Sequence, residues 1–481
     1  MNRRSFLQVA VAGMAATALS SSLALGAPVK FARGLRSVPD RGMARRPLRL
    51  VAGKMPEGFS GTYYLNGPAK FERGNTQYDH WFDGDGKINA CRFGDEGATH
   101  EARFVETPKF KAEQKAGRFL YPGFDTFPPD PAPATKSDDI NAANISVLPV
   151  GDQLWALWEG GSPTAVKRSD LSTEGLVTLG EGLEGVPFSA HPRVDPQGRI
   201  WGFGNSAFTS QLLLYELGPD GSLKRAKVLD DVPPSMVHDF TATEKHLIVG
   251  FAPFLIAGYE GTYLDRFTWH ADKPRFYYVI DKESFEVTRR YELPAAFVFH
   301  HFNAWEEADG TIRFASCAYE DGGFMTEEAR DMMKGEPFSG KNEAEFEAIT
   351  LYPDGTHKVE RDGIKAEFPV CDPRMAGHRT ESFHIGHGSG GNSFSNAYIS
   401  RGPDGAITGR WEAEADTHLG EHVAIPRPDG KVWLIGTQFD SMRGRTLVSL
   451  FDGGNVSAGP MALWETPEVI PLPLHGAWVP A

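Results

Sequence analysis

One turn chemistry recurs along the chain and limits the folds open to it. An aspartate stands directly or shortly before a glycine, often after a proline, so that proline presets φ, aspartate caps the turn and glycine takes the positive φ. The turns are expected at 84–86, 195–198, 219–221, 308–310, 353–355, 403–405 and 428–430. Strand-like runs rich in β-branched and aromatic residues follow several of them, such as 199–203, 311–315 and 431–435. Hairpins repeated at irregular intervals predict an all-β propeller or a large barrel.

Helical patterns are scarce. Residues 108–116 follow Thr107, a possible cap, begin with a proline and end before Gly117. Residues 326–334 carry acids early and a base late, which favours a second short helix. The Pro-, Asp- and Phe-rich residues 122–137 indicate a long loop. These segments are expected at one end of the β scaffold.

Composition excludes some classes of function. The formal net charge is −14, and such an acidic surface argues against nucleic-acid binding, which depends on neutralising phosphates. The three cysteines are Cys91, Cys317 and Cys371, which are odd in number and far apart. They imply neither a disulfide framework nor a CxxC metal site. Nothing in the sequence indicates an oligomeric state.

The N-terminus is a targeting segment. Arg3 and Arg4, followed by Phe-Leu and the weakly apolar run 9–25, predict a twin-arginine signal and export to a periplasm. A Sec signal or a short membrane anchor is the alternative, but an anchor needs about 20 strongly apolar residues. We therefore expect a signal peptide at 1–26, an arm at 27–45 and a single β domain at 46–481.

Two adjacent histidines lie in the apolar stretch 297–307. Neighbouring side chains of a strand point to opposite faces, so if His300 points inward, His301 points outward. A lone buried histidine is most often a core residue, but His191, His238 and His475 have similar apolar or turn-bounded settings. No local element can gather residues so far apart in the sequence. A propeller can, because the inner strand of each blade faces the central axis.

The sequence motifs around these histidines are distinctive. His191-Pro-Arg-Val-Asp-Pro, His238-Asp-Phe-Thr-Ala-Thr, His300-His-Phe-Asn-Ala-Trp-Glu and His475-Gly-Ala-Trp-Val-Pro resemble the four histidine motifs of the carotenoid cleavage oxygenase family. Residues 61–68 and 81–86 resemble two further sequence motifs of that family, and all six motifs follow the order in which the family has them. The resemblance runs from about Leu48 to Pro480, which is nearly the whole chain after the signal.

The resemblance implies a fold and a cofactor. The family forms a seven-bladed β-propeller with a dome of helices and loops over one face, and it binds a non-haem Fe(II) on the axis. The four expected ligands are His191, His238, His300 and His475. Three glutamates, which match Glu159, Glu367 and Glu421, are expected to bind the far nitrogens of three rings. Neutral imidazoles suit iron, and carboxylates behind them fix the ring tautomers.

The resemblance also implies a reaction. The family cleaves a non-aromatic carbon–carbon double bond with dioxygen and forms two carbonyl products. Where the family often has Thr or Val, fourteen residues before the first glutamate, this chain has Ile145. A branched apolar group there predicts one open coordination place. Leu65 stands where the family usually has arginine, and we expect only a local structural effect.

The substrate is inferred from two positions. Stilbene-cleaving relatives hold the phenol of their substrate with a lysine and a tyrosine, and Trp158 and Phe104 look like their counterparts here. A phenol without those partners would lose roughly 1–3 kcal/mol. We therefore favour a carotenoid or apocarotenoid. The alternative for these two residues is that both are plain core residues.

Two other functions remain open from the sequence. The first is a dioxygenase that cleaves stilbenoids or phenylpropenoids, and the second is a propeller that binds a ligand without turnover. A carotenoid has to be drawn from a membrane, so we also expect a peripheral membrane contact. Its candidate segments are 108–116, 123–133 and 324–333, which could present an apolar patch.

Overall fold

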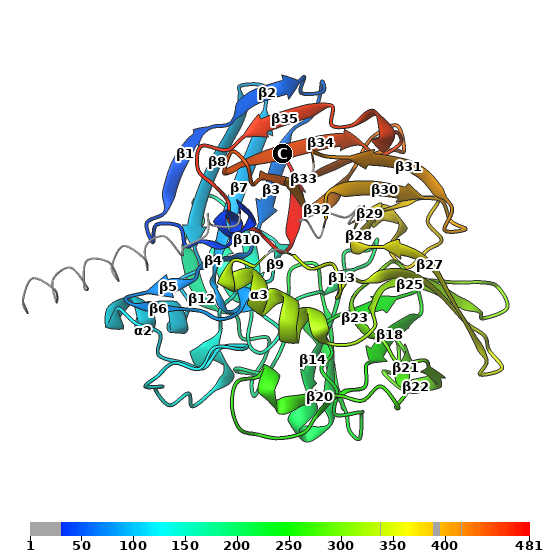
Figure 1. Ribbon diagram of the computed structural model, residues 1–481. Coiled ribbons are helices and arrows are strands. Elements are labelled where there is room, and N and C mark those ends of the chain that lie inside the picture. The colour runs from blue at the N-terminus through cyan, green and yellow to red at the C-terminus, as the bar shows by residue number, and fades with distance from the viewer. Residues whose placement is uncertain (1–29, 337, 388–394, 415) are drawn as a thin grey trace, which may run out of the picture.

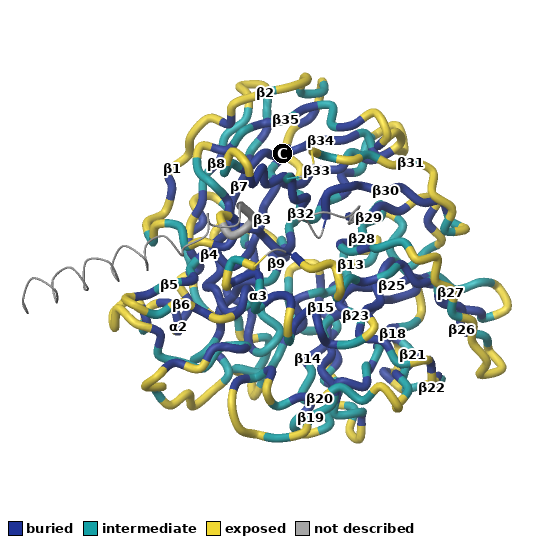
Figure 2. Tube along the Cα trace, viewed as in Figure 1, coloured by how far each residue is buried: buried dark blue, intermediate teal, exposed yellow. Residues whose placement is uncertain are grey.

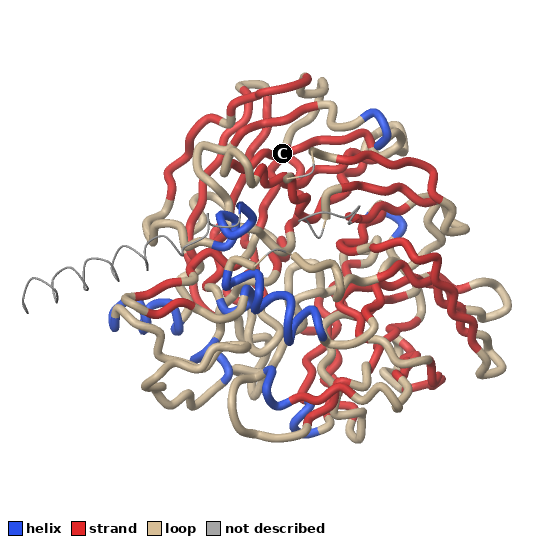
Figure 3. Tube along the Cα trace, in the orientation of Figure 1, coloured by secondary structure: helices blue, strands red, loops and turns tan. Residues whose placement is uncertain are grey.

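The computed structural model describes residues 30–336, 338–387, 395–414 and 416–481, so the expected signal at 1–26 lies outside the described residues. Seven antiparallel sheets surround a central axis and form a seven-bladed β-propeller (Figure 1). This confirms the all-β prediction. Strands make up most of the regular structure, and the few helices are short (Figure 3).

The strands of each blade are given from the axis outward. Blade 1 contains β36 (Gly476–Pro480), β3 (Gly61–Leu65), β7 (Asp85–Gly94), β8 (Gly97–Phe104) and β1 (Met43–Pro47). Blade 2 contains β9 (Ser146–Val150), β10 (Gln153–Leu157), β11 (Thr164–Lys167) and β12 (Thr173–Leu176). Blade 3 contains β13 (Arg193–Val194), β14 (Ile200–Ser206), β15 (Gln211–Leu217) and β16 (Leu223–Leu229). Blade 4 contains β17 (Phe240–Ala242), β18 (His246–Phe251), β21 (Arg275–Asp281) and β22 (Val287–Leu293).

The remaining three blades follow the same pattern. Blade 5 contains β23 (Phe297–His301), β25 (Ile312–Tyr319), β26 (Glu345–Leu351) and β27 (His357–Lys365), and β24 (Trp305–Glu306) also pairs with β25. Blade 6 contains β28 (Glu367–Cys371), β29 (Phe383–His387), β30 (Ala397–Arg401) and β31 (Ile407–Glu412). Blade 7 contains β32 (Thr417–Pro426), β33 (Val432–Asp440), β34 (Arg445–Asp452), β35 (Ala462–Glu465) and β2 (Arg49–Gly53).

Short elements connect and cover the blades. The minor strands are β4 (Pro68–Lys70), β5 (Glu72–Arg73), β6 (Thr76–Gln77), β19 (Phe254–Ile256) and β20 (Phe267–Trp269). The helices are η1 (Lys30–Leu35), η2 (Trp81–Asp83), α2 (Pro108–Ala116), η3 (Ser137–Ile140), η4 (Ala207–Thr209), η5 (Leu264–Arg266), η6 (Phe324–Glu328), α3 (Ala329–Lys334), η7 (Pro373–Met375) and η8 (Val456–Ala458). Helix α3 crosses in front of the sheets in Figure 1 and contacts η1, η2 and η6. Among the described residues, no helix is long and apolar enough to cross a membrane.

Both ends of the described chain close the ring. The C-terminal strand β36 pairs with β3 over its whole length, so blade 1 is built from the two ends of the propeller. Strand β1 is the outer strand of blade 1, and β2 is the outer strand of blade 7. The expected arm at 27–45 therefore ends inside a strand, because β1 begins at Met43. Four of the five residues of this edge strand are exposed, so the sequence shows no alternating pattern there.

Six of the seven expected turns are present, and each places its glycine at positive φ. These glycines are Gly198, Gly221, Gly310, Gly355, Gly405 and Gly430. The expectation for 84–86 is wrong, because Asp85 begins β7 and is buried. Its carboxylate accepts from Arg73 Nη2 and from Lys109 Nζ at 2.8 and 2.7 Å. The aspartate there serves a buried ion cluster rather than a turn.

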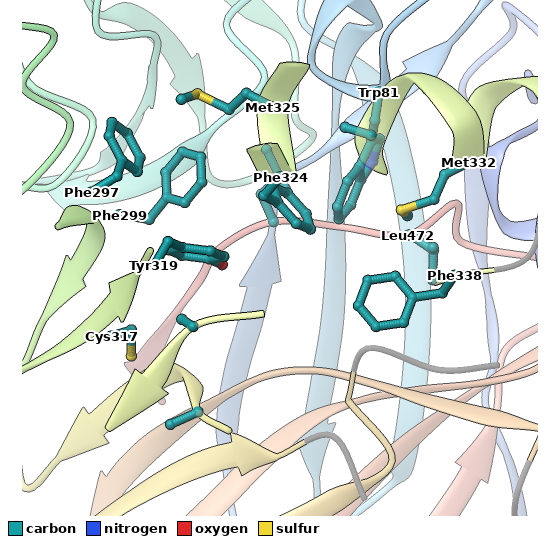
Figure 4. Packing of buried hydrophobic residues seen from close by; sticks show 14 of the residues in the cluster. Trp81, Phe297, Phe299, Cys317, Tyr319, Phe324, Met325, Met332, Phe338 and Leu472 are labelled. Atoms are coloured by element: carbon teal, nitrogen blue, oxygen red, sulfur yellow. The ribbon is translucent and has the colours of Figure 1, made fainter. Parts of the chain in front are cut away.

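The helix expected at 108–116 is present with those bounds, and the Thr107 hydroxyl accepts from the Phe110 amide. The helix expected at 326–334 begins earlier, because η6 adds one π-helical stretch from Phe324. Phe324 and Met325 are buried, so apolar packing extends the helix beyond its acidic start (Figure 4). Buried chain concentrates in the inner parts of the blades, as Figure 2 shows.

Candidate metal centre

The seven inner strands meet at one point on the axis, and each contributes one residue to it. Four of these residues lie one or two positions before their strand, and the other three lie within theirs. In blade order from blade 2 the residues are Ile145, His191, His238, His300, Glu367, Glu421 and His475. Glu159 is the exception, since it follows the second strand of blade 2 rather than an inner strand. The fold thus assembles residues that are hundreds of positions apart.

The four histidines converge. One ligand-type atom from each of His191, His238, His300 and His475 lies within 4.8 Å of the other three. His191 Nε2 and His238 Nε2 are 2.9 Å apart, and the ring of His191 is 4.5 Å from that of His475. The rings are not stacked but meet edge to face, and the planes of the His191 and His475 rings are 89° apart. The sequence prediction had grouped these four residues.

Three carboxylates stand behind three of the rings. Glu159 Oε2 is 2.5 Å from His238 Nδ1, and Glu367 Oε2 is 2.5 Å from His300 Nδ1. Glu421 Oε1 is 3.1 Å from His475 Nδ1, and its other oxygen accepts from the Gly476 amide. The structure therefore brings each glutamate expected from the sequence to one ring.

Irregular backbone places several of these groups. The register of the inner strand shifts between Val298 and His301, between Glu367 and Val370, and between Leu419 and His422. Each shift brackets a residue of the site, and bulges re-aim side chains in this way. In blade 5 the shift lets the consecutive residues Phe299 and His300 both line the axial cavity. Strict alternation would have separated them.

The electrostatics favour neutral rings for His191 and His475. Burial, together with His475, His238 and His300 nearby, holds the pKa of His191 well below its ordinary value. Burial also lowers the pKa of His475, although Glu421 opposes it. For His300, burial opposes protonation, but the pairing with Glu367 raises its pKa and lowers that of Glu367.

The donor set fits a metal ion. Three Nδ1 atoms face carboxylates, so those rings donate there and present unprotonated Nε2 atoms to the axis. His300 Nε2 is buried without a hydrogen-bond partner, and two other Nε2 atoms approach to 2.9 Å. Converging lone pairs repel one another unless a cation lies between them. A transition metal with a preference for imidazole meets that need.

An apolar cavity of about 90 Å³ adjoins the histidines. Ile145 and Trp158 line it, as do Phe82, Phe124 and Phe324, and Phe299 packs edge-on against Phe324 (Figure 4). Sequence reasoning did not identify the phenylalanines, although the match at 81–86 and the Phe-rich loop at 122–137 were signals for two of them.

Phe104 does not lie at this cavity, so the sequence assignment is wrong. It stacks on Phe110 with 5.2 Å between ring centroids, in a separate small core with Ala69. Phe104, the last residue of β8, faces α2 because Phe110 of that helix packs against blade 1 at this point. Leu65, the other departure from the family pattern, is fully buried in β3 and pairs with Gly476.

His301 points away from the four rings. Its Nε2 lies 3.1 Å from the Tyr277 hydroxyl, and its backbone amide donates to Asp239. The prediction that only one of the two adjacent histidines faces the axial cavity agrees with the cavity lining, which includes His300 and not His301.

Comparisons with known proteins agree with this architecture. The model of the retinal pigment epithelial membrane protein family matches residues 37–480. The chain is 31% identical to the apocarotenoid-15,15'-oxygenase of Synechocystis over 89% of this chain and 92% of that protein. It is 27% identical to a carotenoid 9,10(9',10')-cleavage dioxygenase of Pisum sativum over 89% and 86% of the two chains. A resveratrol cleavage oxygenase of Botryotinia fuckeliana is 26% identical over 90% and 82%.

Solved structures agree as well. The cobalt-substituted apocarotenoid oxygenase of Synechocystis superposes with a TM-score of 0.83 at 30% identity and covers 95% of this chain and 99% of its own. Solved variants of that enzyme change a glutamate, the tryptophan directly before it and a threonine fourteen positions before it. Glu159, Trp158 and Ile145 have the same spacing here. The relatives named above are oxygenases, which supports an enzyme and argues against the interpretation as a non-catalytic propeller. The chain belongs to the carotenoid cleavage oxygenase family.

Proposed function

We propose that this protein is an Fe(II)-dependent dioxygenase that cleaves a non-aromatic double bond of a carotenoid or apocarotenoid. The observation that carries the proposal is the convergence of four imidazoles beside an apolar cavity. His191, His238, His300 and His475 would hold the ion. Four neutral imidazole ligands from the protein would suit ferrous iron. Iron held there would supply the activation of dioxygen, and both oxygen atoms would end in the two carbonyl products.

The residues of this chain have separate tasks in that reaction. Glu159, Glu367 and Glu421 orient three rings and return negative charge without occupying a coordination place. Ile145 puts a branched apolar group beside the histidines, which supports a single open place. The aromatic lining excludes water and receives a flat, apolar chain. No residue has to act as a general base, since no proton is abstracted in the cleavage.

The polar groups of Asn144 and Tyr319 in the cavity already have hydrogen-bond partners, which favours a polyene over a phenol as substrate. The Asn144 amide nitrogen already donates to the carbonyls of Phe82 and Gly84. The Tyr319 hydroxyl donates to Glu367 at 2.9 Å. A phenol beside Trp158 would therefore compete with existing hydrogen bonds, at a cost of roughly 1–3 kcal/mol for each group left unpaired.

A substrate panel tests the proposal. Iron-loaded protein is incubated with an apocarotenal and, separately, with a hydroxystilbene, and the aldehydes are identified by mass spectrometry. We expect two carbonyl products from the apocarotenal, with labelled dioxygen incorporated into both. The matched control is His238→Ala, which should form neither product. Aldehydes from the hydroxystilbene alone would favour the stilbenoid alternative, which the likeness to resveratrol cleavage oxygenases keeps in view.

We further propose that the protein is exported through its twin-arginine segment and meets its substrate at a membrane surface. Arg3 and Arg4 carry the first part, and the exposed rings of Phe127 and Tyr259 support the second. Replacing both arginines with lysine should keep the protein in the cytoplasm of a twin-arginine-competent host. Flotation with liposomes tests the surface contact, and activity without binding to any lipid would rule it out.

A further inference from the structure

A second layer of side chains lies directly behind the four histidines. Arg193 is two residues after His191, Asp239 follows His238, and His301 follows His300. These three residues belong to blades 3, 4 and 5, which are consecutive around the axis. Each of these three inner strands, together with the two residues directly before it, therefore carries both a histidine of the centre and one member of this layer.

The layer is tightly connected. Arg193 Nη2 donates to both carboxylate oxygens of Asp239, each at 2.8 Å, and to the His301 carbonyl at 3.2 Å. Arg193 Nε donates to the Phe240 carbonyl at 2.8 Å. The His301 amide donates to Asp239 Oδ2 at 2.7 Å. One carboxylate thus accepts from blade 3 and from blade 5 while it belongs to blade 4.

These contacts matter most for His191. Its ring has no carboxylate partner among the described residues, whereas the other three rings each have one. The strand that follows it, β13, is only two residues long, and β14 is its one partner strand in the described part of the chain. On the side of blade 2, Ser146 Oγ donates to the Ala190 carbonyl at 2.5 Å. On the side of blade 4, the Arg193 side chain ties the strand to Asp239 and Phe240.

We infer that Asp239 is a positioning residue of the metal centre, which fixes the inner strands of blades 3, 4 and 5 at the spacing their histidines need to share one ion. It touches neither substrate nor metal and acts through Arg193 and the His301 backbone. Its side chain is 1% exposed, so the contacts are not weakened by water. The inference rests on the proposed metal site.

Cobalt(II) binding to the metal-stripped full-length protein tests the inference without using activity. Asp239→Asn keeps the size of the side chain and an acceptor for the His301 amide, but loses the charge and the two-oxygen contact with Arg193. We expect cobalt affinity to fall at least about tenfold, as for other groups that orient metal ligands, and the visible spectrum of the bound cobalt to shift. Asp239→Glu should recover part of both.

The matched control is Glu347→Gln. Glu347 accepts from Arg275 at 2.6 Å, and this fully buried ion pair also joins blades 4 and 5, but through β26 and β21 rather than the inner strands. The control should lower the melting temperature while cobalt affinity and spectrum stay at wild-type values. A shift of the same size in the control would mean that any loosening of these blades has this effect, and would overturn the specific role of Asp239.

Two further outcomes are decisive. Folded Asp239→Asn with wild-type cobalt affinity and spectrum would overturn the inference. If that variant does not fold, Arg193→Lys provides the test, because Arg193 is partly exposed and lysine keeps the charge but loses the fork. It should weaken cobalt binding several-fold and shift the spectrum, and unchanged values would overturn the inference. Wild-type protein that binds no cobalt would instead overturn the metal site and, with it, this inference.

Discussion

Glu367 and His300 lie on the inner strands of neighbouring blades, with 2.5 Å between Glu367 Oε2 and His300 Nδ1. The same carboxylate accepts from the Phe368 amide at 2.8 Å and from the Tyr319 hydroxyl at 2.9 Å. Phe368 has a positive φ of 54°, which is uncommon for a phenylalanine. The backbone is therefore held in an unfavourable conformation at the point where it presents this carboxylate to the ring.

Glu367→Gln should weaken iron binding 10- to 100-fold, since partners that orient a metal ligand typically contribute that much to affinity. Glutamine keeps the hydrogen bond but removes the charge that polarises the ring of His300. The measurement is iron stoichiometry after dialysis against a chelator series. Glu360→Gln, at an exposed position on β27, is the matched control and should retain wild-type iron. Equal retention in both variants would contradict the role of Glu367.

The two adjacent histidines and His238 should behave differently on replacement. His238→Ala removes a ring from the centre and should abolish iron retention. His301→Ala should keep most of the iron, because the hydrogen bonds of His301 with Asp239 and Arg193 run through its backbone amide and carbonyl. Its ring Nδ1 lies farther from Asp239 Oδ2, at 3.5 Å. Metal analysis of the two purified variants checks this. Equal iron in both would contradict the assignment of the ligands.

The sequence predicted the propeller and the convergent histidines because both depend on short sequence motifs. Proline, aspartate and glycine fix the turns, and an intact motif surrounds each histidine. The bulge that turns both Phe299 and His300 toward the cavity was not predictable, because it depends on the pairing of β23 with β25. Phe104 was misplaced for a similar reason, since the packing of α2 on blade 1 decides which way the end of β8 faces.

Removing the last six residues should unfold the propeller. Strand β36 pairs with all five residues of β3, and Gly476 donates to Glu421 behind the centre. Without it, blade 1 presents an unpaired inner edge and the ring no longer closes, which promotes aggregation. We expect insoluble protein, or a melting transition lowered by tens of degrees. Soluble, cooperatively folded protein of wild-type stability would show that closure by β36 is dispensable.

The pH dependence of stability should reveal a group of buried histidines outside the metal centre. Burial lowers the pKa of His80, His384 and His422 to about 4. An unfolded chain binds protons on such residues near pH 6.5, so between pH 6.5 and 4 the unfolded state holds more protons than the folded one. Stability is therefore fully present above pH 6.5 and is lost as the pH falls. Asp83, whose pKa burial raises to about 6, opposes this trend in part, because it favours the folded state as the pH falls.

His422→Gln isolates one of these residues. The ring of His422 is completely buried, with Nε2 3.0 Å from Ser449 Oγ and Nδ1 3.1 Å from the Gly420 carbonyl. Glutamine can bond to the same region but does not titrate. Between pH 7 and pH 4.5, the wild type should lose about 2 kcal/mol more of its free energy of unfolding than the variant does. Urea unfolding at several pH values measures the difference. Parallel curves would contradict the prediction, because they would mean that His422 binds its proton in the folded state as readily as in the unfolded chain.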